Sequence, residues 1–236
     1  MDNIPMTFDA PQEDEFAVLL QCWHSLYLGI TFPRREKHYS QYLTFENASP
    51  THLEEWKEAL SFFMKKLTLK YDRPLVLKAP GHTARIRHIL DMFPDAKFVH
   101  IHRDPYTIYQ SFNHYVDTAM WYTYLQRPDW DNIDESILNR YSTMYDAFFE
   151  DKALIPEGQF YELSFEDLEK DPMGQMNSLY STLNLPEFES FKPKLGEYID
   201  SIKDYEKNAF EPLCADKRKT VAQRWERCFN EWGYEI

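Results

Sequence analysis

Glycine is scarce in this chain, which has only 6 glycines among its 236 residues. At the average usage of roughly 7%, about 17 would be expected. Glycine is the usual residue where a backbone wraps closely around a phosphate, yet neither G-x-x-x-x-G-K-[ST] nor G-x-G-x-x-G occurs here. The sequence therefore excludes an intact P-loop or Rossmann fingerprint at the level of the motif.

Long apolar runs and paired cysteines are also missing. No stretch is apolar for the 18 residues that a membrane helix needs, and the N-terminus lacks the regions of a secretory signal. The three cysteines, Cys22, Cys214 and Cys228, have no metal-binding spacing. An odd number of scattered thiols fits a reducing compartment, so we expect a cytoplasmic protein. Because no long apolar run is present, we also expect no membrane partner.

Acidic residues outnumber basic ones by 39 to 26, which gives a formal net charge of −13. This balance argues against nucleic acid as a partner. Residues 61–110 depart from it, with nine Lys or Arg, four Asp or Glu and a net charge of +5. We interpret the segment as a localised site for a small anion. Chance clustering of charge on a solvated face is the alternative.

The spacing of hydrophobic residues predicts helices that alternate with short strands. Thr51 and Glu54 fit a capping box, and Asp104 with Pro105 fits the start of another helix. We expect helices over about 11–28, 51–67, 86–93, 105 to beyond 111, 134–150, 176–183 and 216–231, and strands at 75–78, 97–102 and 160–163, with a loop at 29–50. Strands joined through helices predict a parallel α/β sheet.

Charged residues follow two of the predicted strands, and ligands bind at the carboxyl ends of parallel strands. Lys78 ends the first strand and Arg103 follows the second. The Arg103 fork can hold a phosphate bidentately, and Ser111 can add a hydroxyl two helical turns later. An ion pair between Arg103 and Asp104 is the alternative. His100 and His102 share a strand face but have no third ligand at convincing spacing, so we expect no metal site.

Several segments resemble the PAPS-dependent sulfotransferases of the bacterial-type branch. The most specific are L-K-A-P-G-H at 77–82 and F-P-D-A-K-F-V-H-I-H-R-D-P at 93–105, followed by Ser111. The segments at 11–16 and 164–168 and the basic C-terminal piece are weaker matches. The resemblance implies one P-loop-nucleotide-hydrolase-like domain over residues 1–236, with a parallel sheet flanked by helices. Residues 1–70 would form its helical acceptor side and 71–236 its donor-binding side.

The same resemblance implies transfer of a sulfuryl group from 3′-phosphoadenosine 5′-phosphosulfate (PAPS), without a metal, to a hydroxyl or amine. Lys78 matches the catalytic lysine of the family, although an exposed lysine is the alternative. His82 would contact donor or acceptor, or act as base, and a structural role at a helix start is the alternative. Glu13 and Glu15 match the region of a glutamate base, but acidic first turns are also favoured by the helix dipole.

Five residues would hold the donor by resemblance. Arg103 and Ser111 match the pair that binds the 3′-phosphate, and Phe165 matches an aromatic placed against adenine. Arg218 and Lys219 match a late basic loop, in which Thr220 stands where the family has glycine. Core packing for Phe165 and surface charge for the last two are the alternatives.

Two features remain open in the sequence. The loop R-S-G-T that holds the 5′-phosphosulfate in the family is missing, so we expect an N-terminally truncated member. A catalytically incomplete domain that binds a nucleotide or a partner is the alternative. We expect a small molecule or a glycan as the acceptor. The aromatic segments 39–45 and 121–130 are candidates to line a pocket for a sugar, phenol or lipid, and core packing or a partner surface is the alternative.

Overall fold

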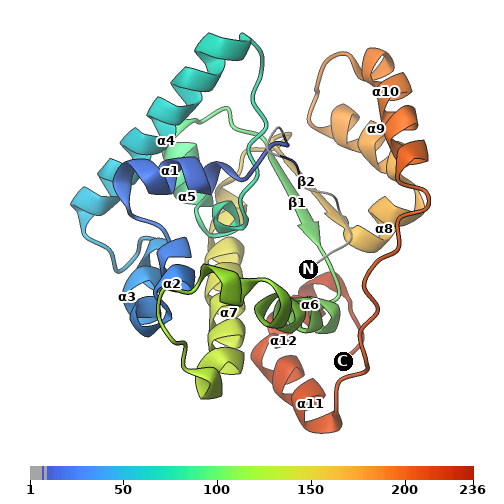
Figure 1. Ribbon diagram of the computed structural model, residues 1–236. Coiled ribbons are helices and arrows are strands. Elements are labelled where there is room, and N and C mark those ends of the chain that lie inside the picture. The colour runs from blue at the N-terminus through green and yellow to red at the C-terminus, as the bar shows by residue number, and fades with distance from the viewer. Residues whose placement is uncertain (1–6, 8–9) are drawn as a thin grey trace.

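Two parallel strands form the centre of the fold. In the computed structural model, which describes residue 7 and residues 10–236, β1 (Phe98–His102) pairs with β2 (Phe160–Ser164). The register aligns Phe98 with Phe160 and His102 with Ser164. Helices lie on both sides of this pair (Figure 1). The predicted parallel α/β arrangement is therefore confirmed.

Most of the described chain is helical. The α-helices are α1 (Asp14–Cys22), α2 (Tyr27–Thr31), α3 (Glu36–Tyr39), α4 (Pro50–Tyr71), α5 (Ile86–Met92), α6 (Pro105–Thr118), α7 (Ile133–Asp151), α8 (Phe165–Lys170), α9 (Pro172–Thr182), α10 (Phe188–Ser201), α11 (Ala215–Arg224) and α12 (Glu226–Trp232). Short 3-10 turns are η1 (Pro33–Arg35), η2 (Ser40–Tyr42), η3 (Pro80–Ala84), η4 (Met120–Thr123), η5 (Trp130–Asn132) and η6 (Lys152–Leu154). No helix in these ranges is both long and apolar enough to cross a bilayer.

The strand β1 has one packed face and one open face, because side chains alternate along a strand. His100 is buried, with its ring 4.3 Å from that of Phe148 on α7. Val99 and Ile101, on the opposite face, are each almost half exposed. The main core therefore lies on the His100 side, where α6, α7, α11 and α12 meet. A second core joins α1 to α4 around Trp56 and Leu60.

The predicted strand at 75–78 is wrong. Residues 74–79 have no strand pairing, and within the described chain β1 pairs with β2 alone. Leu77 packs against the α1–α4 core, whereas Val76 is 95% exposed. An apolar run becomes a strand only where a neighbouring strand accepts its hydrogen bonds.

Several predicted helix ends also change. The first helix ends at Cys22, because Trp23 takes a left-handed conformation with φ of 61°. The expected loop at 29–50 contains α3 and three other short helical segments. The helix α4 starts with Pro50 and is capped by Ser49, which accepts a hydrogen bond from the Thr51 amide, so the capping box at Thr51 is wrong. The C-terminal helix is two helices, α11 and α12, which meet at Trp225.

Candidate functional site

Glu13 joins two segments of the chain at the start of α1. One oxygen of its carboxylate pairs with the ammonium of Lys78, and the other accepts a hydrogen bond from the Tyr27 hydroxyl. The Glu13 side chain is 20% exposed and that of Lys78 is 76% exposed. Burial and the hydrogen bond to Glu13 raise the pKa of Tyr27, which keeps the phenol protonated as a donor. The site therefore presents a partly exposed carboxylate and an exposed cation.

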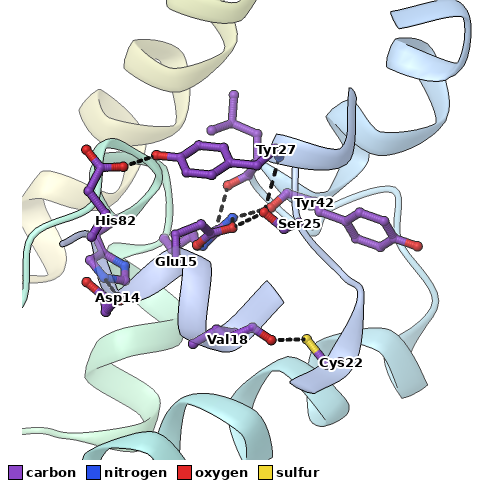
Figure 2. A network of polar contacts seen from close by, with 11 residues as sticks. Asp14, Glu15, Val18, Cys22, Ser25, Tyr27, Tyr42 and His82 are labelled. Atoms are coloured by element: carbon purple, nitrogen blue, oxygen red, sulfur yellow. Dashed lines mark hydrogen bonds and ion pairs between the residues drawn. The ribbon is translucent and has the colours of Figure 1, made fainter. Parts of the chain in front are cut away.

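Glu15 lies in a different environment, two residues further along α1. It is 1% exposed and accepts hydrogen bonds of 2.6 and 3.2 Å from Arg85 and of 2.5 Å from Ser25. Figure 2 shows Glu15 directed at Ser25, inside the network. Burial opposes ionisation of Glu15, but the charge and hydrogen bonds of Arg85 outweigh it and lower the pKa. Glu15 thus has the surroundings of a structural ion pair.

Arg85 is the partner that sequence reasoning missed. Its side chain is fully buried and also donates to the carbonyl oxygens of Tyr42 (2.6 Å) and Leu43 (3.2 Å). Nothing in the local pattern distinguishes Arg85 from the other basic residues of 61–110. Because Arg85 fixes Glu15, it also fixes the start of α1, where Glu13 lies.

His82 pairs with the acidic residue between those two glutamates. Its Nε2 lies 2.8 Å from Oδ2 of Asp14, which is almost fully buried. Figure 2 shows His82 and Asp14 together, apart from the Glu15 contacts. Within the described residues, Nδ1 of His82 and Oδ1 of Asp14 are buried and have no hydrogen-bond partner. Such atoms are costly to leave unpaired, so they offer polar contacts to a water or a ligand.

Arg103 and Phe165 come together where the two strands end. The Arg103 guanidinium lies 4.3 Å above the Phe165 ring, a cation–π contact. Asp104 does not pair with Arg103 as the alternative required, because its carboxylate caps α6 by accepting from the Thr107 amide (2.7 Å) and hydroxyl (2.8 Å). Lys207, which the sequence did not single out, lies 5.8 Å from the same ring. Because Lys207 is paired with Glu169 (2.6 Å), Arg103 is the cation at this ring that is suited to an anionic ligand.

Ser111 lies on α6, and Arg218 contacts the same helix from α11. The Arg218 guanidinium lies 4.1 Å above the ring of Tyr106, in the first turn of that helix. Arg218 and Lys219 lie on α11 and are exposed, so they belong to a helix and not to a loop. Ser111 is half-buried one turn after Thr107. Three of the predicted donor residues thus lie along the start of α6: Arg103 precedes it, Ser111 is in its second turn, and Arg218 covers Tyr106 in its first turn.

Tyr115, on the same helix as Ser111, is affected by the charge of Glu13. It follows Ser111 by four residues on α6, so both side chains lie on one helix face. Burial raises the pKa of Tyr115, and the negative charge of Glu13 raises it further. The charge of Glu13 therefore acts on the same face of α6 that carries Ser111.

Tyr234, near the C-terminus, contacts residues at the ends of both strands. Its hydroxyl donates to Glu166 (3.0 Å) and lies 2.8 Å from Nδ1 of His102. Since a phenol has one proton, the His102 Nδ1–H must be the donor in the second contact. Burial lowers the pKa of His102, which favours this neutral ring. Tyr234 thus holds together the residues next to Arg103 and Phe165, a link that no local sequence pattern reveals.

His100 and His102 have partners other than a metal. His100 contacts Glu162 (2.9 Å) and Tyr145 (3.3 Å), and His102 stacks on Trp232. Over residues 7 and 10–236, no three His, Cys, Asp or Glu side chains are grouped as metal ligands would be. The two histidines form part of the packing between β1 and α12.

Comparisons with known proteins give consistent results. A family model described as "Sulfotransferase family" matches residues 4–190. Two proteins named omega-hydroxy-beta-dihydromenaquinone-9 sulfotransferase Stf3, from Mycobacterium tuberculosis and Mycobacterium bovis, are 37% identical to the chain over 235 residues. The crystal structure of sulfotransferase STF9 from Mycobacterium avium matches with a TM-score of 0.80 at 18% identity, which shows a shared fold. Each of these three proteins aligns with the whole of this chain, which spans 60% of its length.

Proposed function

The chain belongs to the sulfotransferase family, and we propose that it transfers a sulfuryl group from PAPS to a hydroxyl or amine of a small-molecule or glycan acceptor. The proposal is supported by Glu13, a partly exposed carboxylate held between a lysine and a phenol. This single arrangement supplies both a proton acceptor and a cation, which sulfuryl transfer requires.

The donor fits the chemistry of the residues around α6. We propose that Phe165 stacks on the adenine and that Arg103, Ser111, Arg218 and Lys219 bind the 3′-phosphate. Guanidinium and hydroxyl groups suit phosphate, and an aromatic face suits a purine. The Arg103 guanidinium over the Phe165 ring supports this assignment.

In the reaction, the acceptor oxygen or nitrogen forms a bond to sulfur, and the bond from sulfur to the bridging oxygen of the donor breaks. We propose that Glu13 takes the acceptor proton and that Lys78 stabilises the negative charge on the leaving phosphate. Tyr27 orients Glu13 through its hydrogen bond. His82 is the second candidate to contact the reactants, because its Nδ1 has no partner among the described residues. Glu15 is not proposed as the base, because both of its carboxylate oxygens accept hydrogen bonds from Arg85.

Transfer of labelled sulfate from PAPS to a panel of alcohols, phenols, sugars and amines tests the proposal. We expect transfer by the 236-residue chain and its loss in Lys78→Ala and Glu13→Gln. Lys70→Ala, an exposed lysine at the end of α4, is the matched control and should transfer normally. Transfer that is absent, or equal in Lys78→Ala, would contradict the proposal.

A second candidate is a nucleotide-binding domain without catalysis. The motivating observation is that the chain has no R-S-G-T loop and spans 60% of the length of its curated relatives. A thermal shift with 3′-phosphoadenosine 5′-phosphate (PAP), together with no transfer to any acceptor, would favour this candidate over the enzyme.

A further inference from the structure

Asp14, the first residue of α1, carries a buried carboxylate directly after Glu13. Its side chain is 3% exposed, and its Oδ2 lies 2.8 Å from Nε2 of His82 (Figure 2). A carboxylate that is taken out of water needs a partner, because an unpaired buried charge is strongly destabilising. His82 provides that partner, so this contact joins the start of α1 to η3.

The same contact determines which nitrogen of His82 carries a proton. An ionised carboxylate only accepts hydrogen bonds, so the Nε2–H of His82 donates to Asp14. In the neutral ring, Nδ1 then has no proton, and this atom is buried without a partner among the described residues. Asp14 thus holds the ring in one tautomer and one orientation.

The backbone of His82 is bonded to the residue that follows Lys78. Its amide donates to the carbonyl oxygen of Ala79 (3.0 Å), and its own carbonyl oxygen accepts from the Arg85 amide (3.0 Å). Within the described chain, residues 74–79 have no strand pairing, so no neighbouring strand holds the backbone of Lys78. The turn η3 therefore fixes the backbone after Lys78, and His82 is the nearest of its side chains that is anchored in α1.

The ion pair of Glu13 with Lys78 is too weak to set its own geometry. The Lys78 side chain is 76% exposed, and ion pairs in water contribute little because solvent screens them. A long lysine side chain also loses rotamer freedom when it is held in one place. The separation of Glu13 and Lys78 is therefore determined by the buried contact beside it, in which Asp14 follows Glu13 and His82 follows Lys78 by four residues.

We propose that Asp14 is a positioning residue, which through His82 holds Lys78 at the distance from Glu13 that sulfuryl transfer requires. This inference rests on the proposed function, because it concerns the same two reacting groups. The separate ion pair between α1 and Arg85 maintains the fold of this region, so loss of Asp14 should disturb the reacting groups without unfolding the chain. A displacement of about 1 Å can lower a rate about 100-fold.

Steady-state kinetics with PAPS, and with the panel compound that the 236-residue chain sulfates fastest, gives the first test. Asp14→Ala should lower kcat about 10- to 100-fold. The KM for PAPS and the Kd of PAP should not change, because Lys78 acts on charge that develops in the transition state. Asp14→Asn retains an oxygen that accepts the Nε2–H of His82, so it should recover most of kcat.

His82→Gln separates positioning from a direct contact of His82 with the reactants. The amide nitrogen of glutamine can still donate to Asp14, but glutamine cannot take up a proton. A kcat near that of the parent chain, with the same dependence of kcat/KM on pH, supports positioning. If His82→Gln instead loses kcat together with one limb of the pH profile, His82 acts on the reactants and the inference is overturned.

Cross-linking with a carbodiimide measures the geometry without any sulfate transfer. The reagent condenses a carboxylate and an amine in contact to an amide, with loss of water, so Glu13 and Lys78 should give a cross-link that mass spectrometry detects. It should be largely lost in Asp14→Ala and restored in Asp14→Asn. Asp151→Ala is the matched control, because Asp151 is as buried as Asp14 and pairs with Arg87 (2.7 Å) at the end of α7. Its cross-link and kcat should be normal.

The outcomes separate this inference from the proposed function. A cross-link that is as abundant in Asp14→Ala as in the parent chain overturns the inference, even if PAPS sulfates an acceptor. If the parent chain sulfates no compound of the panel, the proposed function fails, and the cross-link alone decides whether Asp14 positions Lys78. If Asp14→Ala does not fold, the double variant Asp14→Ala with His82→Leu replaces it, because it leaves neither polar atom of the pair buried alone.

Discussion

Glu13 and Glu15 should respond in opposite ways to the same substitution. Glu15→Gln removes one charge of a fully buried ion pair and leaves the Arg85 guanidinium uncompensated. Breaking a buried pair from one side costs about 3–5 kcal/mol. Since a native domain has a free energy of unfolding of only about 5–15 kcal/mol, Glu15→Gln should lose a large share of it.

Glu13→Gln should behave as a functional substitution. Its ion-pair partner Lys78 is 76% exposed, so loss of the pair costs at most about 1 kcal/mol. A glutamine oxygen can still accept a hydrogen bond from the Tyr27 hydroxyl, which limits the loss of stability further. Removal of a general base, in contrast, lowers the transfer rate by about 10²- to 10⁴-fold.

Urea unfolding monitored by tryptophan fluorescence, together with sulfate transfer from PAPS, measures both effects. The double variant Glu15→Leu with Arg85→Met is the control, because an apolar replacement of the whole pair should recover much of the lost stability. The reasoning is refuted if Glu15→Gln unfolds within about 1 kcal/mol of the parent chain. If that variant is also inactive while Glu13→Gln remains active, Glu15 is the base.

Three further predictions concern the donor site and the sheet. Arg103→Ala should raise the Kd of PAP about 10- to 100-fold by titration calorimetry, with Arg103→Lys restoring only part; an unchanged Kd would refute the 3′-phosphate assignment. Tyr234→Phe should weaken PAP binding about three- to tenfold by freeing Glu166, whereas a purely structural role would change only the unfolding midpoint. Although burial opposes ionisation, hydrogen bonds from His100 and Lys152 lower the pKa of Glu162 to about 2. Ionised Glu162 stabilises the fold fully above its unfolded pKa, by up to about 3 kcal/mol, and this stabilisation is lost as the pH falls towards 2. In urea unfolding, Glu162→Gln should lack this pH-dependent part of the free energy of unfolding.

Elements with a strong local pattern were predictable. The apolar run of β1, the Asp104 cap with Pro105, and the spacing within α7 and α9 each depend on residues that are close in sequence. The segment 75–78 has an equally apolar pattern, but its pairing depends on a neighbouring strand that local sequence does not specify. Sequence alone can therefore locate extended segments more reliably than it can decide which of them pair.

The functional contacts were less accessible, because their partners lie far apart in the chain. Glu15 and Arg85 are separated by 70 residues, and His102 and Tyr234 by 132. Residue type made Glu13 and Glu15 equivalent candidates for the base. Only the packing of Arg85 distinguishes them, and the family resemblance, which marks segments and not contacts, could not do so.

The acidic start of α1 shows how the basic segment is divided between structure and function. Three consecutive residues, Glu13, Asp14 and Glu15, pair with Lys78, His82 and Arg85 respectively. Consecutive helical residues point about 100° apart, so each meets a different partner along 78–85. Part of the positive charge of residues 61–110 therefore attaches this segment to α1, and does not remain free for an anion.

Arg103 differs from those partners, because it contacts an aromatic ring and its neighbour Asp104 is occupied in capping α6. Lys207, near the same ring, comes from outside the basic segment and pairs with Glu169 (2.6 Å). Arg218, also from outside it, lies over Tyr106 in the first turn of α6. An anion site at α6 therefore depends on chain segments that meet only after folding. A local excess of basic residues predicts a region for this proposed site, but Lys78, His82 and Arg85 within it already pair with carboxylates of α1 and its cap.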